Sequence, residues 1–374
     1  MYHSIHWSVP VVDREAEKTV RADAREFILT VVADGAKNLA KQLQGEFGVA
    51  RITANRYIDA AIDAGLIRRV SRGHFSLVTT QTEFSYPIDG LEEHTVWRDD
   101  IRPLFAGLPD NVDAILHYGC TEMINNCIDH SEGTVVMIDV QSTARATRIA
   151  IYDDGVGIFR KIADSLDLDD ERQSVLELAK GKFTTDPNNH TGEGIFFTCQ
   201  AMDNYSISSR GTHFSHKAGD DMDWVIGTDY VPVNDDVTGT LVDMSMENNS
   251  ATDLDDIYSA YQGEELGFVK TIVPVRLLAV GEDRLVSRSQ AKRLLNRFDR
   301  FKEVVLDFDD VESVGQAFAD EVFRVFVLAH PEVKLIPIRQ NEAVSRMITR
   351  AMAHSDLLPK RNRQTNRSPT ASDL

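Results

Sequence analysis

The chain has 374 residues, of which 42% are hydrophobic and 26% charged, and its formal net charge at pH 7 is −19. This length exceeds one ordinary core, so two or three globular domains are expected. The negative charge argues against a protein that binds nucleic acid with its whole surface. No apolar run reaches the roughly 20 residues that cross a bilayer, and the first seven residues lack the features of a secretory signal. Three cysteines without metal spacing indicate reduced thiols in a cytosolic protein.

The charge is unevenly distributed along the chain. Residues 1–80 hold 11 Lys/Arg against 9 Asp/Glu, whereas the rest of the chain is strongly acidic. Any contact with nucleic acid is therefore expected in the N-terminal part. Residues 356–374 form a basic, polar tail that we expect to be disordered.

Residues 15–80 are expected to form the first domain. Helical periodicity covers residues 22–32, 36–48 and 54–64; Thr53 is the predicted N-cap of the third helix and Gly65 its end. Residues 66–70 and 74–78 read as two strands of a hairpin. The stretch 79–94 is polar and contains Pro87 and Gly90, which is typical of a linker.

Three helices followed by a hairpin resemble a winged helix-turn-helix. The resemblance rests on Phe47-Gly48-Val49, Arg51-Ile52-Thr53, Arg56-Tyr57-Ile58 and Ala64-Gly65-Leu66-Ile67. It implies that the third helix enters the DNA major groove and that the hairpin approaches phosphates. The residues implied in DNA binding are Thr53, Asn55 and Arg56 on the helix and Arg68, Arg69 and Arg72 on the wing. A winged helix that binds protein, or that only packs, is the alternative.

Residues 95–250 contain three motifs in close succession. Glu122, Asn126 and His130 are spaced four apart, so on a helix they share one face. An amide oxygen there can ligate Mg²⁺, and a carboxylate can orient or deprotonate an attacking water. A solvated helix face is the alternative for this motif.

The other two motifs are rich in glycine. Asp153-Asp-Gly155-Val-Gly157 follows a strand-like run, where a carboxylate can accept a hydrogen bond from an adenine amino group. Thr191-Gly192-Glu-Gly194 precedes an apolar helix-like run, where N–H groups can hold phosphates. An ordinary Asp-Gly turn and a chance Gly-x-Gly are the alternatives.

Together the three motifs resemble the Bergerat-fold (GHKL) ATPase superfamily of gyrase B subunits, heat-shock chaperones, MutL repair proteins, histidine kinases and anti-sigma serine kinases. The resemblance implies that ATP and Mg²⁺ are bound, with Glu122 as general base, Asn126 as metal ligand and Asp153 recognising adenine. It further implies a lid over 158–190. The remaining implied nucleotide-site residues are Asp129, His130, Gly155, Gly157, Lys182, Gly192, Gly194 and Thr240.

Residues 263–355 alternate strand-like runs (304–308, 333–338) with helix-like ones (289–298, 316–328, 343–352). The runs Val304–Phe308 and Val314–Glu321 resemble a STAS-like domain, the fold of anti-sigma factor antagonists. Phosphorylated members carry Ser or Thr where this chain has Gln316 and Ala317, and Ser313 is expected in the preceding loop. The expected fold class is therefore α/β (α+β) multidomain: winged helix, α/β sandwich with a mixed sheet, and small STAS-like domain.

Three functions stay open at this point. One is a regulator that binds Mg-ATP and hydrolyses it or transfers its γ-phosphate, while the outer domains contact DNA and a protein partner. The second is a serine/threonine protein kinase that acts on another chain, and the third is a transcription factor that senses ATP without turnover. Prolines at 87, 103 and 109 disfavour the helical hairpin of a sensor histidine kinase. The oligomeric state is open, with a homodimer among the alternatives.

Overall fold

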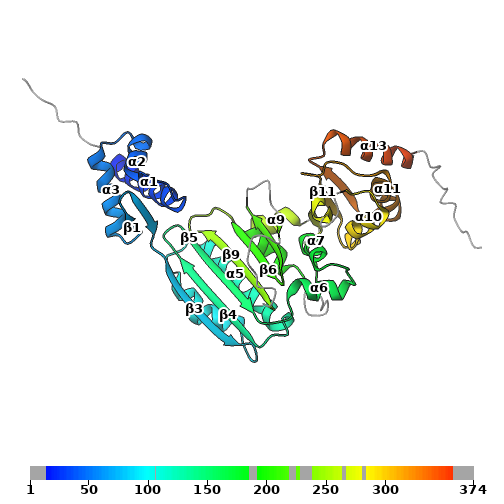
Figure 1. Cartoon of the computed structure of the whole chain (residues 1–374), viewed down its shortest axis with the longest axis horizontal. Helices are drawn as coiled ribbons and strands as arrows, with labels where there is room; N and C mark the ends of the chain where they lie inside the picture. Colours follow the sequence, from blue (N-terminus) through cyan, green and yellow to red (C-terminus); the bar gives the residue numbers. More distant parts are fainter. Residues whose placement is uncertain are drawn as a thin grey trace, which may run out of the picture. The chain divides into compact units, whose positions relative to one another are not determined.

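The computed structural model describes residues 14–105, 107–184, 192–218, 225–227, 238–262, 267–279 and 284–356 (Figure 1). The chain divides into two units, each assembled from segments that are distant in sequence. Unit 1 holds residues 1–158, 198–223 and 231–254, and unit 2 holds 159–197, 224–230 and 255–374. Helices and several sheets alternate along the chain, which confirms the predicted α/β multidomain class.

The N-terminal part of unit 1 is a three-helix cluster followed by a hairpin: α1 (Arg14–Ala33), α2 (Leu39–Phe47), α3 (Arg51–Asp63), β1 (Ile67–Ser71) and β2 (His74–Leu77). Apolar side chains from all three helices and β1 form one core. The prediction that Thr53 caps α3 was wrong, because the helix begins at Arg51 with Ala50 at the N-cap. The apolar pattern hid this start, since Ile52 in the first turn is 76% exposed.

A second correction concerns the predicted linker over 79–94. Residues 80–87 form a strand, β3 (Thr80–Pro87), which pairs antiparallel with β4 (Val135–Ser142) over its whole length. Its side chains alternate between exposed and half-buried, and the half-buried Tyr86 hydroxyl donates to Asp100 Oδ2 at 2.8 Å. A strand at a sheet edge needs apolar residues at alternate positions only, so polar composition concealed it.

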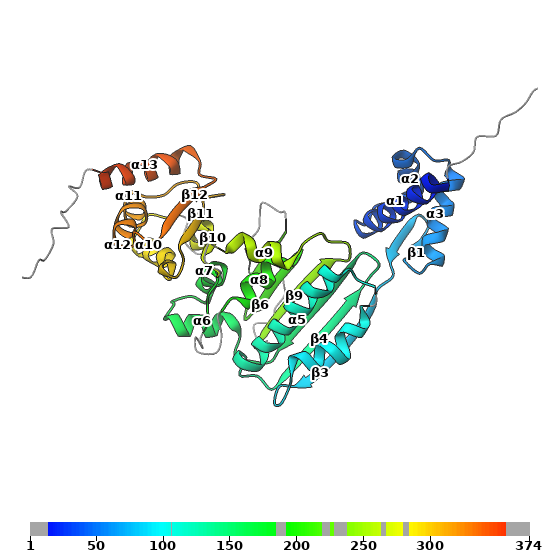
Figure 2. The ribbon, with the colours of Figure 1, turned by 180° about the vertical axis from the view of Figure 1, so that it is seen from behind.

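The largest sheet has the strand order β3-β4-β5-β9-β6-β7-β8, and six of its strands, all but β8, lie in unit 1. Every pairing among these six strands is antiparallel, whereas a mixed sheet was expected; β4–β5 and β6–β7 follow each other in sequence as hairpins. One face is covered by the long helix α5 (Figure 2). The further elements are α4 (Glu93–Val96), η1 (Trp97–Ile101), η2 (Arg102–Leu104), α5 (Asp110–His130), β5 (Ala146–Asp153), β6 (Asn204–Ser209), β7 (Thr212–Lys217) and β9 (Thr240–Glu247).

Unit 2 is built around the parallel sheet β10-β11-β12, in which β11 (Glu303–Asp307) and β12 (Lys334–Ile338) match predicted strands and β10 (Lys270–Pro274) was not predicted. Its helices include two from the predicted lid, α6 (Ile158–Leu166) and α7 (Ser174–Lys180). The others are η3 (Glu171–Gln173), α9 (Leu254–Tyr261), η4 (Val275–Ala279), α10 (Arg288–Leu295), η5 (Phe298–Arg300), α11 (Gln316–Asp320), η6 (Glu321–Phe326), α12 (Val327–Ala329) and α13 (Glu342–Asp356). The remaining elements are α8 (Gly194–Ala201), which crosses from unit 2 into unit 1, and the short β8 (Val225–Gly227).

Candidate functional site

α5 carries the polar residues that the sequence places at four-residue spacing. Glu122, Asn126 and His130 all lie on this helix, which confirms the predicted helix over the motif. They are half-buried, whereas Asp129 is exposed and Cys127 is buried. The helix therefore presents a carboxylate and an amide one turn apart, at the border between the core and solvent.

The Asp153 carboxylate ends β5 and is the buried acid of the site, with 5% of the residue exposed. Oδ1 accepts from the Gly155 backbone N–H at 2.9 Å, and Cys127 Sγ makes a weak contact with Oδ2 at 3.8 Å. Burial raises the pKa of Asp153, while hydrogen bonds from Gly155, the Thr240 backbone and Cys127 oppose that rise. Because Cys127 belongs to α5, this contact places the carboxylate against that helix.

Glycines shape the backbone around this carboxylate. A Cβ at Gly155 would lie 2.1 Å from Ser131 O, and one at Gly239 would lie 1.9 Å from Asp153 O. Gly157 and Gly239 also have φ of 90° and 101°, in the left-handed region that side chains disfavour. The Asp-Gly motif is therefore a tightly packed turn next to α5, and the site depends on the absence of side chains at these positions.

Thr240 lies directly opposite Asp153 in the β5–β9 register. Its hydroxyl accepts from the Ile158 backbone N–H at 3.0 Å, while its backbone hydrogen-bonds the Asp153 carboxylate. The threonine thus links the late strand both to the carboxylate and to the end of the glycine turn. The part that Thr240 plays at a nucleotide stays a prediction.

Asp154 has a different role from its neighbour, one that the sequence did not reveal. Its exposed carboxylate accepts from the Thr134 N–H at 2.6 Å, the Thr134 hydroxyl at 2.7 Å and the Val135 N–H at 2.9 Å. These bonds lower the pKa of Asp154 to about 2. Asp154 therefore anchors the start of β4 to the glycine turn. In the sequence, the only signal that could distinguish the roles of Asp153 and Asp154 is that successive residues of a strand point to opposite faces.

The second glycine motif belongs to unit 2. Thr191 lies outside the described residues, Gly194 opens α8, and Gly192 has φ of 71°. A Cβ at Gly192 would lie 2.4 Å from Phe183 O, so this glycine too is required by close backbone packing. The role of both glycines at phosphates stays a prediction.

Lys182, the predicted phosphate contact, is engaged within unit 2. Its Nζ donates to Arg300 O at 3.1 Å and lies 5.4 and 4.9 Å from the ring centroids of Phe268 and Phe301. Partial burial lowers the pKa of Lys182. In this conformation the ammonium is therefore held by an apolar and carbonyl environment of the C-terminal part of the chain.

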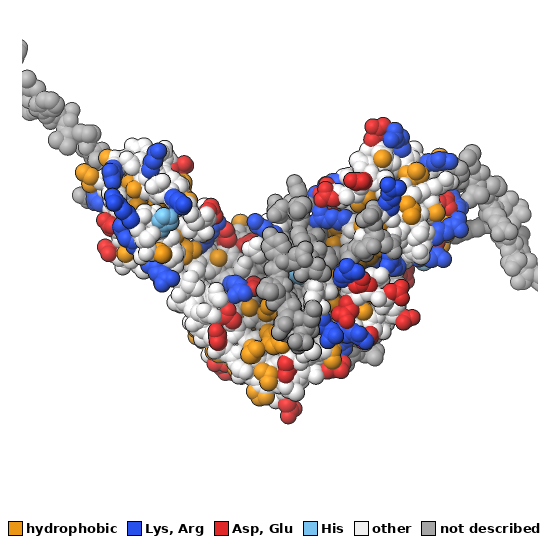
Figure 3. Space-filling view, viewed as in Figure 1, with side chains coloured by type: hydrophobic (Ala, Val, Ile, Leu, Met, Phe, Trp, Pro, Cys, Tyr) orange, Lys and Arg blue, Asp and Glu red, His pale blue; other side chains and the backbone are white. Residues whose placement is uncertain are grey.

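The predicted DNA-binding residues lie on the N-terminal helices and hairpin, where Figure 3 shows Lys and Arg side chains gathered on one face. Asn55 and Arg56 are exposed on α3, and Thr53 is half-buried in its first turn. Arg68, Arg69 and Arg72 are exposed on the hairpin. Arg69 stacks over the Phe75 ring at 5.1 Å, and Arg68 Nε donates to the Ser76 hydroxyl at 3.0 Å.

Comparisons with known proteins add one family. The model of a STAS-like domain of unknown function (DUF4325) matches residues 290–345, within the range 263–355 that was expected to form such a domain. No curated protein matches the chain. Within the described ranges, no helix is long and apolar enough to cross a membrane, and no group of three or more His, Cys, Asp or Glu residues is arranged to hold a metal ion by itself.

Proposed function

We propose that the chain is a regulatory protein that binds Mg-ATP in unit 1 and passes the state of this site to its flanking domains. The STAS-like match is compatible with a regulatory role. The observation that carries the ATP proposal is the buried Asp153 carboxylate, held against α5 by a turn that only glycine can form. A buried acid at a strand end costs solvation free energy, so its retention favours a ligand that donates a hydrogen bond to it.

The residues around Asp153 suit a purine nucleotide. A carboxylate has roughly four acceptor positions, and the structure gives this one three donors, from Gly155, Thr240 and Cys127. The exocyclic amino group of adenine is a suitable further donor. On α5, Asn126 would ligate Mg²⁺ through its amide oxygen, and Glu122 would orient or deprotonate the attacking water. The metal would neutralise charge on the phosphates and would complete its coordination with their oxygens and water.

Isothermal titration with ATP, with and without Mg²⁺, tests this proposal. Asp153→Asn should weaken binding by about 10- to 100-fold, because a charged hydrogen bond is lost. Asp110→Asn, at the opposite end of α5, is the control and should bind as the wild type does. Absence of binding by the wild type, or equal affinity in Asp153→Asn, would remove the basis of the proposal.

Turnover requires a separate measurement. Glu122→Ala should retain ATP binding and lose phosphate release by about 10²- to 10⁴-fold, the usual contribution of a general base. Hydrolysis that survives this change would show that another group activates the water. Binding without any phosphate release in the wild type would favour an ATP sensor.

A protein kinase acting on another chain is a second candidate. α11 begins at Gln316 with Gly315 at the N-cap, so the position of the family's phosphorylated residue is held by side chains that cannot accept phosphate. The STAS-like match nevertheless pairs this domain with the proposed ATP site in one chain. ATP labelled in its γ-phosphate and added to a lysate distinguishes the two: a labelled protein indicates a kinase, and labelled free phosphate alone indicates an ATPase.

DNA binding by the N-terminal helices is supported by the outer face of α3. Arg51, Asn55 and Arg56 are exposed there beside Ile52, whose 76% exposure is unusual for a branched apolar residue. Amide, guanidinium and methyl groups on one helix face are the groups that read base edges. Selection from random DNA fragments, repeated with Arg56→Ala, tests this interpretation; an affinity independent of salt would contradict phosphate contacts.

A further inference from the structure

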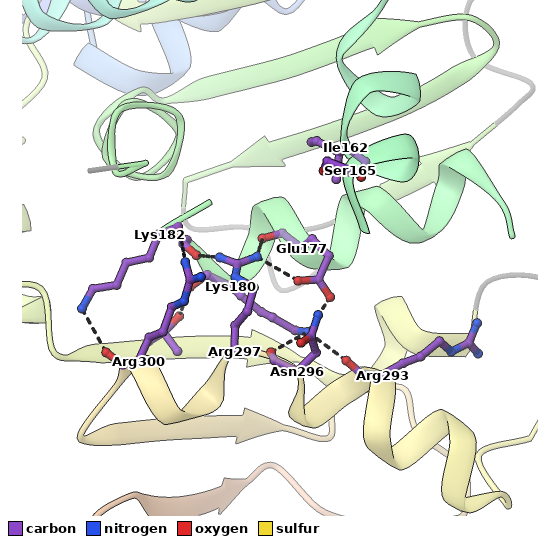
Figure 4. A network of polar contacts seen from close by, with 11 residues as sticks. Ile162, Ser165, Glu177, Lys180, Lys182, Arg293, Asn296, Arg297 and Arg300 are labelled. Carbon is purple, nitrogen blue, oxygen red and sulfur yellow. Dashed lines mark hydrogen bonds and ion pairs between the residues drawn. The ribbon is translucent and has the colours of Figure 1, made fainter. Parts of the chain in front are cut away.

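Residues 159–184, the described part of the segment between the two glycine motifs, pack within unit 2. Residues 159–184 include α7, and the C-terminal residues 255–356 include α10 and the parallel sheet, all in the same unit. Figure 4 shows the polar contacts that join α7 to the end of α10. Residues 177–182 and 293–300 supply the groups, and we call them the α7–α10 network.

Lys180 lies at the centre of the α7–α10 network, with a side chain that is fully buried. Its ammonium donates to Glu177 Oε1 at 2.7 Å, to Arg293 O at 2.9 Å and to Asn296 O at 3.2 Å. The three donors of the ammonium are thus all used. Two acceptors are carbonyls at the C-terminal end of α10, so a lysine of α7 caps that helix and its negative dipole end.

Arg297 makes the second buried connection. It donates to Glu177 Oε2 at 2.8 Å, to Glu177 O at 3.3 Å and to Gly181 O. The side chains of Arg297 and Glu177 are 7% and 4% exposed. Glu177 therefore stands between two buried cations, and each cation also binds backbone carbonyls across the contact between α7 and α10.

The residues after α7 extend the same contact. The Thr271 hydroxyl of β10 donates to Lys180 O at 2.9 Å, and Lys182 and Arg300 each donate to the other's carbonyl at 3.1 Å. A Cβ at Gly181 would lie 2.7 Å from the Phe268 ring. Sliding α7 over α10 would break several of these contacts together, because Lys180 donates to carbonyls at the end of α10 and Arg297 donates to Glu177 and Gly181.

We propose that α7 and the STAS-like part of unit 2 change conformation together. Residues 159–184 would thereby transmit the nucleotide state to the C-terminal domain. The part of this proposal that involves nucleotide rests on the ATP site proposed above, whereas the mechanical link between α7 and α10 does not. Since coupling is reciprocal, a partner bound to the C-terminal domain would change nucleotide affinity by the same factor. The α7–α10 network is the physical element that makes α7 and α10 change state together.

Hydrogen exchange followed by mass spectrometry on the full chain tests the link without nucleotide. Glu177→Gln changes α7 only, but it leaves two buried cations without their carboxylate. Exchange should accelerate in peptides of both α7 and α10, by about a hundred- to a thousandfold in each. Asp164→Asn on the exposed face of α6 is the matched control and should change exchange by less than about threefold. Acceleration confined to α7 would overturn the proposal.

The response to nucleotide is tested by hydrogen exchange in the same peptides of α7 and α10, after titration has measured ATP binding. In the wild type, a nonhydrolysable ATP analogue with Mg²⁺ should alter exchange in α7 and α10 in parallel. Glu177→Gln should bind the analogue but no longer pass the change to α10. Binding with an unchanged α10 in the wild type would overturn the coupling. Absence of binding would instead refute the ATP site, and the nucleotide-free comparison would still decide the link between α7 and α10.

Discussion

The buried carboxylate of Glu177 gives the sharpest quantitative prediction for this protein. Glu177→Gln keeps the size of the side chain but removes a charge that lies 2.7 Å from Lys180 Nζ and 2.8 Å from Arg297 Nη1. Removing one partner of a buried ion pair costs about 3–5 kcal/mol, since the other charge is left uncompensated. We expect a loss of this size in the local stability of α7 at pH 7.

Part of that loss should depend on pH. Burial is the main cause that lowers the pKa of Lys180 from 10.5 to about 8. Its folded-state pKa lies below the unfolded value, so between pH 8 and 10.5 the unfolded chain binds more protons and the contribution of Lys180 to stability rises with pH. In Glu177→Gln, Lys180 can lose its proton to avoid a buried charge without a partner. The pKa of about 8 lies one unit above pH 7, so removing this proton at pH 7 costs about 1.4 kcal/mol. Arg297 has no such escape, because a guanidinium stays charged.

The destabilisation by Glu177→Gln should therefore shrink by about 1.4 kcal/mol between pH 7 and pH 9, or roughly tenfold in amide exchange. The ratio of exchange rates between variant and wild type at each pH measures it, because the intrinsic rate cancels. A ratio that is large and equal at both pH values would show that Lys180 does not titrate in this window. A ratio near one at both would refute the inference that the buried network holds α7 in place.

Three further outcomes follow from the geometry of unit 1 and its N-terminal helices. Gly239→Ala should lower the thermal unfolding temperature, by a loss of about 3 kcal/mol or more, since its Cβ would lie 1.9 Å from Asp153 O at a φ of 101°. Asp154→Asn should destabilise modestly at neutral pH, and the difference from the wild type should shrink as the pH falls from 3.8 through 2. The pKa of this acid is lowered to about 2, so its contribution to stability is present above pH 3.8 and is lost on acidification, which acid titration by circular dichroism follows. Arg72→Ala should weaken binding to all DNA sequences alike and reduce the slope of log affinity against log salt by about 1, as measured by fluorescence anisotropy.

The elements that could be predicted are those with a strong local pattern. α5 carries polar residues at four-residue spacing around a buried stripe, and β11 has three consecutive buried apolar residues, Val304 to Leu306. α2 and α3 are each followed by a glycine with positive φ, at Gly48 and Gly65, as the sequence indicates. Local chemistry decides such features, so one sequence suffices to place them.

The missed elements depend on tertiary context. β3 gains its stability from pairing with β4 and carries only alternate half-buried residues, of which Phe84 and Tyr86 were the available signal. β10 includes a lysine and a threonine, yet Thr271 is fully buried because its hydroxyl donates to Lys180 O. When a buried polar residue finds its hydrogen-bond acceptor on a distant part of the chain, its sequence pattern predicts a surface residue.

In the candidate site, too, local spacing could be predicted and contacts between distant segments could not. Spacing predicted that Glu122 and Asn126 share a helix face, but it could not show that Cys127 connects this helix to Asp153, a contact between residues 26 apart in sequence. The lysines at 180 and 182 show the limit most clearly. The resemblance implied that Lys182 contacts a phosphate and gave Lys180 no role, whereas the structure buries Lys180 completely and places Lys182 against two aromatic rings.

The burial of Lys180 also bears on why this contact is ionic at all. A well-packed apolar contact is often at least as stable as a buried ion pair, so stability alone does not explain two cations around one carboxylate. Apolar surfaces, however, tolerate sliding, whereas the Lys180 ammonium and the two terminal nitrogens of Arg297 each donate to a carbonyl or carboxylate oxygen. A shift of one residue would leave buried charges without acceptors, which is far more costly than lost apolar contact. The network therefore favours one register of α7 on α10. With a single register, a movement of α7 also moves α10, whereas helices that slide over each other would not pass the movement on.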